Sequence, residues 1–194
     1  MAKAKKRKEI CDVAAKLFVE RGFEKTTTRD IASAAGVNTS AIYYYFEDKE
    51  SILYESLMDI MNTSLRQMQE IEKRDISLKE KMNTVIELHT HVYGINRNTT
   101  ELIAYNQRSL NREHWEELRD KQKAYSKIVV RILDEMQKEG EIVNLNTKAC
   151  TFALFGMVQW AHRWYDPRGD INPDQLCEIY TQIFTKGTYS DQEA

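Results

Sequence analysis

The stretch that most constrains this chain reads TTTRDIASAAGVNTSAIYYYFEDK and occupies residues 26–49. Ile31 and Ala35 are four residues apart on one helical face, and Gly36 follows where helices commonly end in a left-handed residue. Ile42 and Phe46 repeat the same spacing and predict the buried face of a second short helix. Two helices joined by a tight glycine turn predict a helix-turn-helix, whose second helix enters the major groove of DNA.

Polar side chains on both sides of this turn are the candidate DNA contacts. We expect one threonine of residues 26–28 to cap the first helix, and the other hydroxyls to donate to phosphate. The planar guanidinium of Arg29 suits guanine, while Ser40 and Tyr44 project away from the apolar face toward base edges. Tyr43 and Lys49 are expected to hold phosphates. The complete candidate set is Thr27, Thr28, Arg29, Asn38, Thr39, Ser40, Tyr43, Tyr44 and Lys49.

The same region resembles a known family of proteins. The matching positions are Gly22-Phe23, Thr26-Thr27, Ile31-Ala32, Ala35-Gly36-Val37, Ile42-Tyr43, Phe46, Lys49-Glu50 and Leu53. Across these positions the chain resembles the TetR family of bacterial transcriptional regulators, although Ser40 stands where family members often carry glycine. The resemblance implies an all-α fold of about nine helices and a homodimer, in which paired heads read a palindromic operator in double-stranded DNA. It also implies that the last two helices of each chain build the dimer as a four-helix bundle.

The resemblance and the helix pattern together suggest two domains. A helix beginning at Lys49, with Asp48 as its cap, extends to about Ile71, so the boundary is expected inside a rigid connection near Ser51. We therefore expect a DNA-binding domain at residues 1–50 and an effector-binding and dimerisation domain at residues 51–194. The basic residues 3–8 form either a solvated tail or an arm that contacts phosphate.

The C-terminal part reads as a helical bundle with a possible small-molecule pocket. Helical stripes run from Ser77 to Tyr93 and from Arg112 to Glu139, and the segment from Gly94 to Thr100 reads as a break. Candidate pocket residues, which could equally form polar or bulky layers between helices, are His89, Tyr105, Arg108, Tyr125, Trp160, Arg163 and Trp164. Candidate residues for the dimer interface are Phe152, Gly156, Leu176, Ile179, Tyr180 and Ile183.

The run WAHRWYDPRG, residues 160–169, bears on the effector. It is similar to family members that respond to acyl-CoA thioesters, and Arg163 and Arg168 could meet the phosphates of coenzyme A. The alternative is a bulky interface plug followed by a helix stop, in which case another hydrophobic or aromatic compound is the effector.

Other functional classes find little support in the sequence. The chain contains no GxSxG, HExxH, P-loop or dinucleotide-binding fingerprint, so we expect neither an enzyme nor a cofactor. His89 and His91 are two residues apart and therefore face different sides of a helix, which argues against a shared metal. Three scattered cysteines suggest small buried residues, and the lack of a signal or membrane segment suggests a cytoplasmic protein. The alternative function is a DNA-binding dimer without an inducer, controlled by a protein partner.

Overall fold

The computed structural model describes residues 2–186, which form two compact units. One unit contains the residues up to Thr63 together with Glu101–Gln122, and the other contains Ser64–Thr100 and the residues from Lys123 onward. The described residues contain helices and no strand, which confirms the all-α prediction. The α-helices are α1 (Ala2–Arg21), α2 (Thr28–Ala34), α3 (Thr39–Tyr45), α4 (Lys49–Lys73), α5 (Leu78–His89), α6 (Arg97–Glu101), α7 (Arg112–Lys138), α8 (Thr147–Gln159) and α9 (Pro173–Lys186).

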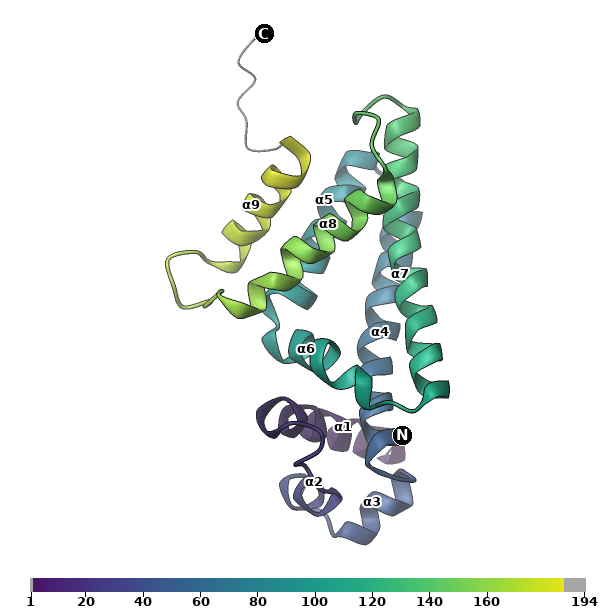
Figure 1. Cartoon of the computed structure of the whole chain (residues 1–194), viewed down its shortest axis with the longest axis vertical. Coiled ribbons are helices and arrows are strands. Elements are labelled where there is room, and N and C mark those ends of the chain that lie inside the picture. Colours follow the sequence, from purple (N-terminus) through teal and green to yellow (C-terminus); the bar gives the residue numbers. More distant parts are fainter. Residues whose placement is uncertain (1, 187–194) are drawn as a thin grey trace. The chain divides into compact units, whose positions relative to one another are not determined.

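Helices α1, α2 and α3 pack into a small head in the first unit (Figure 1). Their apolar residues form one buried core, made by Ile10, Ala14, Leu17, Phe18, Ile31, Ala32, Ile42 and Phe46. Gly36 has φ +64°, the left-handed conformation in which the chain leaves α2 and turns toward α3. The backbone N–H of Val37 then donates to the carbonyl of Ala32, which satisfies a free carbonyl at the end of α2. The predicted helix-turn-helix is therefore present.

The basic N-terminus differs from the expected arm. Residues 3–8 belong to α1, which starts six residues before the predicted helix at residue 8. The guanidinium of Arg7 donates to the carbonyl of Tyr45 at 2.7 Å and to the carboxylate of Glu55 at 3.1 Å. Lys8 pairs with Asp59 at 2.6 Å. Hydrogen-bond acceptors that are distant in the sequence thus stabilise these basic residues as the first turns of α1. The same contacts attach α1 to α3 and α4.

The second unit is a bundle in which α5, α8, α9 and the C-terminal part of α7 bury their apolar faces (Figure 1). The most buried residues include Met82, Val85, Ile86, Val129, Ile132, Leu154, Val158 and Leu176. Ser77 caps α5 through a capping box with Glu80. The two compact units do not follow the predicted domain boundary at residue 50, since α4 contributes residues to both units. The division into residues 1–50 and 51–194 stays a prediction.

A break was predicted over Gly94 to Thr100, but helical turns cover this segment except at Asn96. Residues Thr90–Ile95 continue α5 as a π-helical turn, and Asn96 alone separates this turn from α6. A second π-helical turn, Leu102–Asn106, and a short 3₁₀ turn, Gln107–Ser109, follow α6. Gly94 lies so close to α8 that a Cβ would approach Val158 to 3.3 Å. Glycine therefore serves close helix packing here and does not end the helix.

Two further expectations concern membrane-spanning segments and the cysteines. No helix in the described part of the chain is long and apolar enough to cross a membrane. Cys11, Cys150 and Cys177 are free; Cys11 and Cys177 are buried, whereas Cys150 is partly exposed. Burial raises the pKa of both buried thiols to about 11, so neither is a thiolate near neutral pH.

Candidate functional site

The reading helix α3 is held by a side-chain cap at its start. The Asn38 side chain accepts from the backbone N–H of Ala41 at 2.8 Å, and the Ser40 hydroxyl donates to the same oxygen at 2.9 Å. Asn38 is therefore the N-cap of α3. The side-chain amide nitrogen of Asn38 and the exposed side of Ser40 lie at the N-terminal end of α3, where the helix dipole favours anions.

The start of α2 is fixed in the same way. Thr27 is the N-cap and forms a capping box with Asp30, whose carboxylate accepts from the Thr27 backbone N–H at 2.8 Å. These hydrogen bonds from Thr27 hold the pKa of Asp30 below its usual value. Thr26 is completely buried and donates to the carbonyl of Gly22, while the hydroxyls of Thr28 and Tyr43 lie 3.2 Å apart. Among the three threonines, Thr28 is thus joined to the reading helix.

The remaining reading candidates lie on the surface of the head. The side chains of Tyr43 and Tyr44 are 56% and 66% exposed, and Arg29 is exposed as well. The ammonium of Lys3 lies 4.7 Å from the centre of the Tyr44 ring, so α1 places one cation beside the reading helix. These side chains therefore form an exposed surface on the head, and their contact with DNA stays a prediction.

Lys49 has a different position from that expected of a phosphate contact. Its ammonium donates to the carbonyl of Phe23 at 2.7 Å and lies 4.1 Å above the Phe23 ring. Both contacts tie the first residue of α4 to the loop after α1. Lys49 thus has a structural role within the head, and its phosphate contact stays a prediction.

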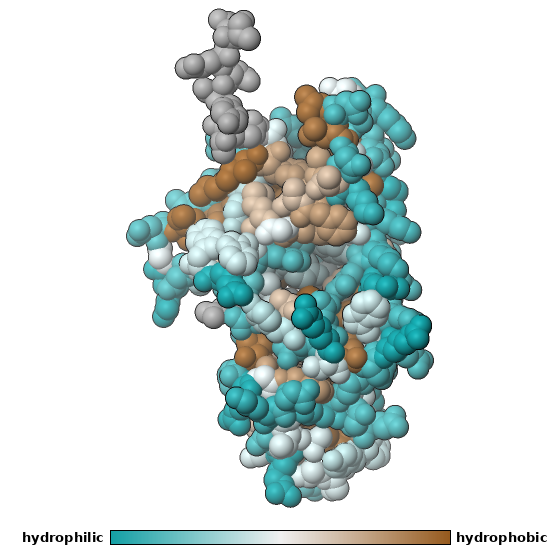
Figure 2. All heavy atoms as spheres, viewed as in Figure 1, coloured by the Kyte–Doolittle hydropathy of each residue, from teal (hydrophilic) through white to brown (hydrophobic). Residues whose placement is uncertain are grey.

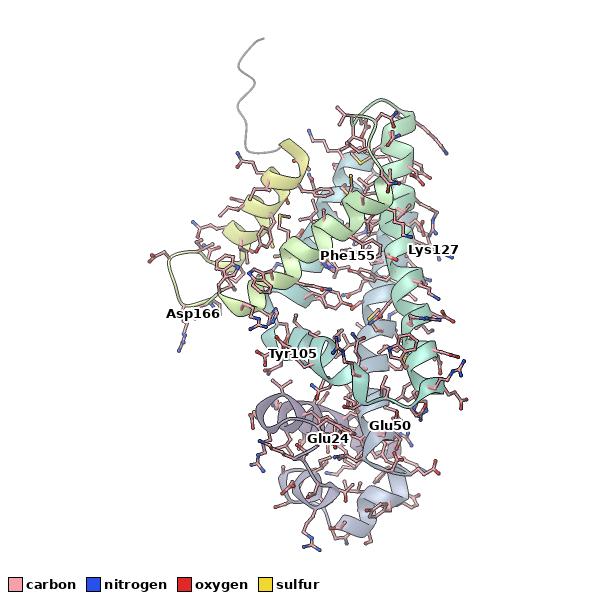
Figure 3. All side chains as sticks on the ribbon, in the orientation of Figure 1. Glu24, Glu50, Tyr105, Lys127, Phe155 and Asp166 are labelled. Carbon is pink, nitrogen blue, oxygen red and sulfur yellow. The ribbon has the colours of Figure 1, made fainter. Side chains whose placement is uncertain are left out.

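A second candidate site is a buried aromatic cluster around His89 in the other unit. His89 is 1% exposed, its Nδ1 lies 3.0 Å from the hydroxyl of Tyr125, and its ring stacks on Phe155 at 4.3 Å (Figure 3). Tyr93 completes the cluster, with its ring 4.7 Å from His89. Burial lowers the pKa of His89 to about 3, so the imidazole is neutral. Within the described residues its Nε2 is buried without a hydrogen-bond partner, which is costly in a protein interior.

The other predicted pocket residues do not join this cluster. Tyr105 and Arg108 are exposed and belong to the first unit, whereas His89 belongs to the second. Trp160 and Trp164 are 61% and 52% exposed, and Arg163 lies over the Trp160 ring at the surface. A helical stripe identifies residues on one face but not whether that face is covered, so a pocket that includes all seven candidates stays a prediction.

Exposed apolar residues of α8 and α9 form one face of the second unit, and Figure 2 shows apolar residues gathered there. Phe152 is 54% exposed, Ile179 and Ile183 are each 39% exposed, and a Cβ at Gly156 would meet nothing within 4 Å. The interface candidates Leu176 and Tyr180 instead lie inside the chain, at 1% and 6% exposure. We call the set Phe152, Ala153, Gly156, Trp160, Ile179 and Ile183 the α8–α9 face.

A polar cluster between α4 and α7 was not predicted from the sequence. It comprises Glu50, Asn111 and His114. The one available signal was Asn111 directly before a long helical pattern, because asparagine is a preferred N-cap. Its pairing with Glu50 across 61 residues is invisible to local patterns. No group of three or more histidine, cysteine or acidic side chains in the described part of the chain is arranged to hold a metal ion.

Comparisons with known proteins agree with this geometry. Residues 10–55 match the model of the bacterial regulatory proteins of the tetR family. Residues 75–188 match the model of the tetracyclin repressor-like C-terminal domain.

Several relatives extend over most of the chain. The HTH-type transcriptional repressor KstR2 of Rhodococcus jostii is 26% identical over 192 residues, covering 97% of this chain and 93% of that protein. The fatty acid metabolism regulator protein of Bacillus subtilis is 29% identical over 151 residues, or 77% and 78% of the two chains. The crystal structure of a TetR/AcrR-family regulator from Thermobifida fusca has a TM-score of 0.78 and 30% identity, covering 96% of this chain and 100% of that chain.

Proposed function

The chain belongs to the TetR family of bacterial transcriptional regulators, and we propose that it is a ligand-responsive repressor that binds a palindromic operator as a homodimer in the cytoplasm. The observation that carries this proposal is the exposed side of α3, which follows a capped glycine turn and presents Ser40 and Tyr44. Thr39 lies in the first turn of the same helix. These side chains are placed to meet base edges, while Thr28 and Tyr43 at the adjoining edge meet phosphate.

The dimer follows from the size of the reading helix and from the α8–α9 face. A reading helix of seven residues spans only a few base pairs, so a specific operator requires two heads on half-sites about 34–36 Å apart or a multiple of this. Exposed Phe152, Ile179 and Ile183 form an apolar surface that water solvates poorly, and a second copy would bury it symmetrically. The small residues Ala153 and Gly156 would let two helices approach closely.

The effector site is proposed at the His89 cluster. A neutral imidazole with an unpartnered nitrogen, surrounded by Tyr93, Tyr125 and Phe155, favours an uncharged apolar group that carries one hydrogen-bonding atom. The acyl chain and thioester carbonyl of an acyl-CoA have this chemistry. The similarity to a regulator named for fatty acid metabolism and the WAHRWYDPRG run support the same class.

A mobility-shift assay on the DNA upstream of the protein's own gene tests the proposal, at one fixed salt concentration and with random DNA as competitor. We expect a specific complex that palmitoyl-CoA dissolves and that free coenzyme A leaves intact. Absence of a specific complex on this and on genome-selected DNA would refute the repressor. A specific complex that ignores acyl-CoA thioesters of all chain lengths would refute this effector class and favour control by a protein partner.

A further inference from the structure

A cluster of three polar residues joins the first turn of α4, where Figure 3 labels Glu50, to the start of α7 in the first unit. The carboxylate of Glu50 accepts from the backbone N–H of Asn111 at 2.9 Å and from the Asn111 side chain at 3.2 Å. His114 Nδ1 donates to the same carboxylate at 2.8 Å. The side chains of His114 and Glu50 are 26% and 16% exposed, so water screens this contact less than an ion pair on the open surface. We call this cluster the α4–α7 latch.

The latch is built into the end of α7. The side-chain oxygen of Asn111 accepts from the backbone N–H of His114 at 2.9 Å and so caps the helix. The Glu50 carboxylate therefore lies at the positive end of a 27-residue helix, where negative charge is favoured. The His114 ring also stacks on Tyr54, with the centroids 3.8 Å apart and the planes 10° from parallel, and the Tyr54 hydroxyl donates to Glu117. Two turns of α4 and two of α7 are thus held together.

Both helices lead away from the latch toward functional residues. Glu50 lies four residues after Phe46, the buried residue that ends α3, and Asp48 caps α4 between them by accepting from the Ser51 N–H at 2.7 Å. Tyr125, which contacts His89, follows His114 by 11 residues in the same helix, α7. A shift of α7 must therefore either move the start of α4 or separate Glu50 from Asn111 and His114.

We propose that the α4–α7 latch couples effector binding to DNA binding: the closed latch holds the operator-binding position of α3, and effector binding at the His89 cluster opens it. The inference rests on the proposed repressor function. Its components are positioning residues, because neither Glu50 nor His114 is placed to touch DNA or effector. The coupling free energy of typical regulators corresponds to changes of about 5- to 150-fold in affinity, which is the range that a latch of this kind has to supply.

Two isosteric substitutions test the latch. Glu50→Gln keeps an accepting oxygen but removes the charge, and His114→Phe keeps the stack on Tyr54 but removes the donor. Glu116→Gln is the matched control, since it makes the same chemical change in a half-exposed α7 carboxylate that pairs with Arg112 on its own helix. Fluorescence anisotropy would measure operator affinity with and without palmitoyl-CoA. We expect each latch variant to lose about 5- to 150-fold in operator affinity and most of its response, while the control keeps both.

A double variant and hydrogen-exchange measurements test the latch independently of the proposed repressor function. If the two residues act as one device, Glu50→Gln/His114→Phe should bind operator no more weakly than the weaker single variant. In the free protein, His114→Phe should speed amide exchange in α3 and the first turns of α4, and this readout needs neither DNA nor effector. Faster exchange confined to α7, or wild-type operator affinity in both single variants, would overturn the latch. Failure of the wild-type protein to bind DNA would refute the repressor, and the exchange data would still decide whether α7 controls α3.

Discussion

At the scale of single residues, exposure separates side chains that can read DNA from side chains that hold the head together. Tyr44 is 66% exposed, whereas Thr26 in the same motif is fully buried and donates to the backbone of the preceding loop. Lys49 and Arg7 carry charges that suit phosphate, yet both donate to backbone carbonyls within the head. Residue type alone therefore does not identify a DNA contact, because a basic side chain can instead donate a hydrogen bond to a backbone carbonyl within the protein.

Replacing Tyr44 tests the reading surface. Tyr44→Ala should lower affinity for the operator by about tenfold or more, since one base contact contributes about 1–3 kcal/mol of discrimination, and should leave affinity for random DNA nearly unchanged. Anisotropy titrations on both DNAs at the same salt measure this difference. Tyr43→Phe is the comparison, because loss of a phosphate-binding hydroxyl should weaken both complexes equally. Equal losses on the two DNAs for Tyr44→Ala would contradict a base-reading role.

The buried imidazole of His89 should make stability depend on pH. Burial lowers the pKa of His89 to about 3, against 6.5 for an exposed histidine. The unfolded chain therefore binds a proton that the native protein excludes, and stability falls as the pH drops through this window, by up to about 1.4 kcal/mol per pH unit.

Urea unfolding of wild-type, His89→Gln and His91→Gln proteins at several pH values measures this effect. His89→Gln removes the titrating group, so its free energy of unfolding should depend less steeply on pH between about 4 and 6. His91→Gln is the matched control, because His91 is an exposed histidine two residues away, and this variant should keep the wild-type slope. Identical slopes in all three proteins would show that His89 does not titrate differently in the two states.

At the scale of elements, caps and turns determine where the helices of the head begin and end. Thr27 caps α2, Asn38 caps α3, and Gly36 makes the turn between them. These signals are local, so the sequence predicts them well. Helix α1 and the π-helical turn after α5 were predicted less well, because their extents depend on distant acceptors and on close packing against α8.

Gly36 provides a test of the turn. Gly36→Ala should destabilise the protein by about 1–2 kcal/mol, the cost of a left-handed conformation for a residue with a Cβ. A Cβ there would meet nothing within 4 Å, so the penalty comes from the backbone alone. Gly36→Asn should lose less, since asparagine tolerates this conformation. Urea unfolding measures both, and an alanine variant as stable as the asparagine variant would exclude a backbone origin.

At the scale of the whole molecule, the α8–α9 face bears on whether one chain suffices for function. Phe152 and Trp160 are more than half exposed on a helix whose opposite side is buried in the second unit. Exposed apolar residues in such a continuous set are unfavourable in water unless another surface covers them. A symmetric partner would cover this face and supply the second head that a palindromic operator requires.

A charge on this face should disrupt the proposed dimer. Phe152→Asp should raise the dissociation constant of the dimer by about 30-fold or more, since loss of a central aromatic residue costs ~2 kcal/mol or more at such interfaces. Sedimentation velocity over a range of concentrations measures the dissociation constant. Lys127→Asp, on the exposed side of α7, is the control and should remain dimeric (Figure 3). A Phe152→Asp protein that is as dimeric as the wild type would move the interface elsewhere.

The sequence by itself determined the helix-turn-helix and the family, because caps, glycine turns and 3,4 spacing are local signals. It also identified the apolar stripes of α8 and α9. Only the tertiary structure decided that Leu176 and Tyr180 are buried within the chain while Ile179 and Ile183 are exposed. It likewise decided that His89 contacts Tyr125 and that Glu50 contacts His114. Helical periodicity shows which residues share a face, but what covers that face depends on segments far away in the chain.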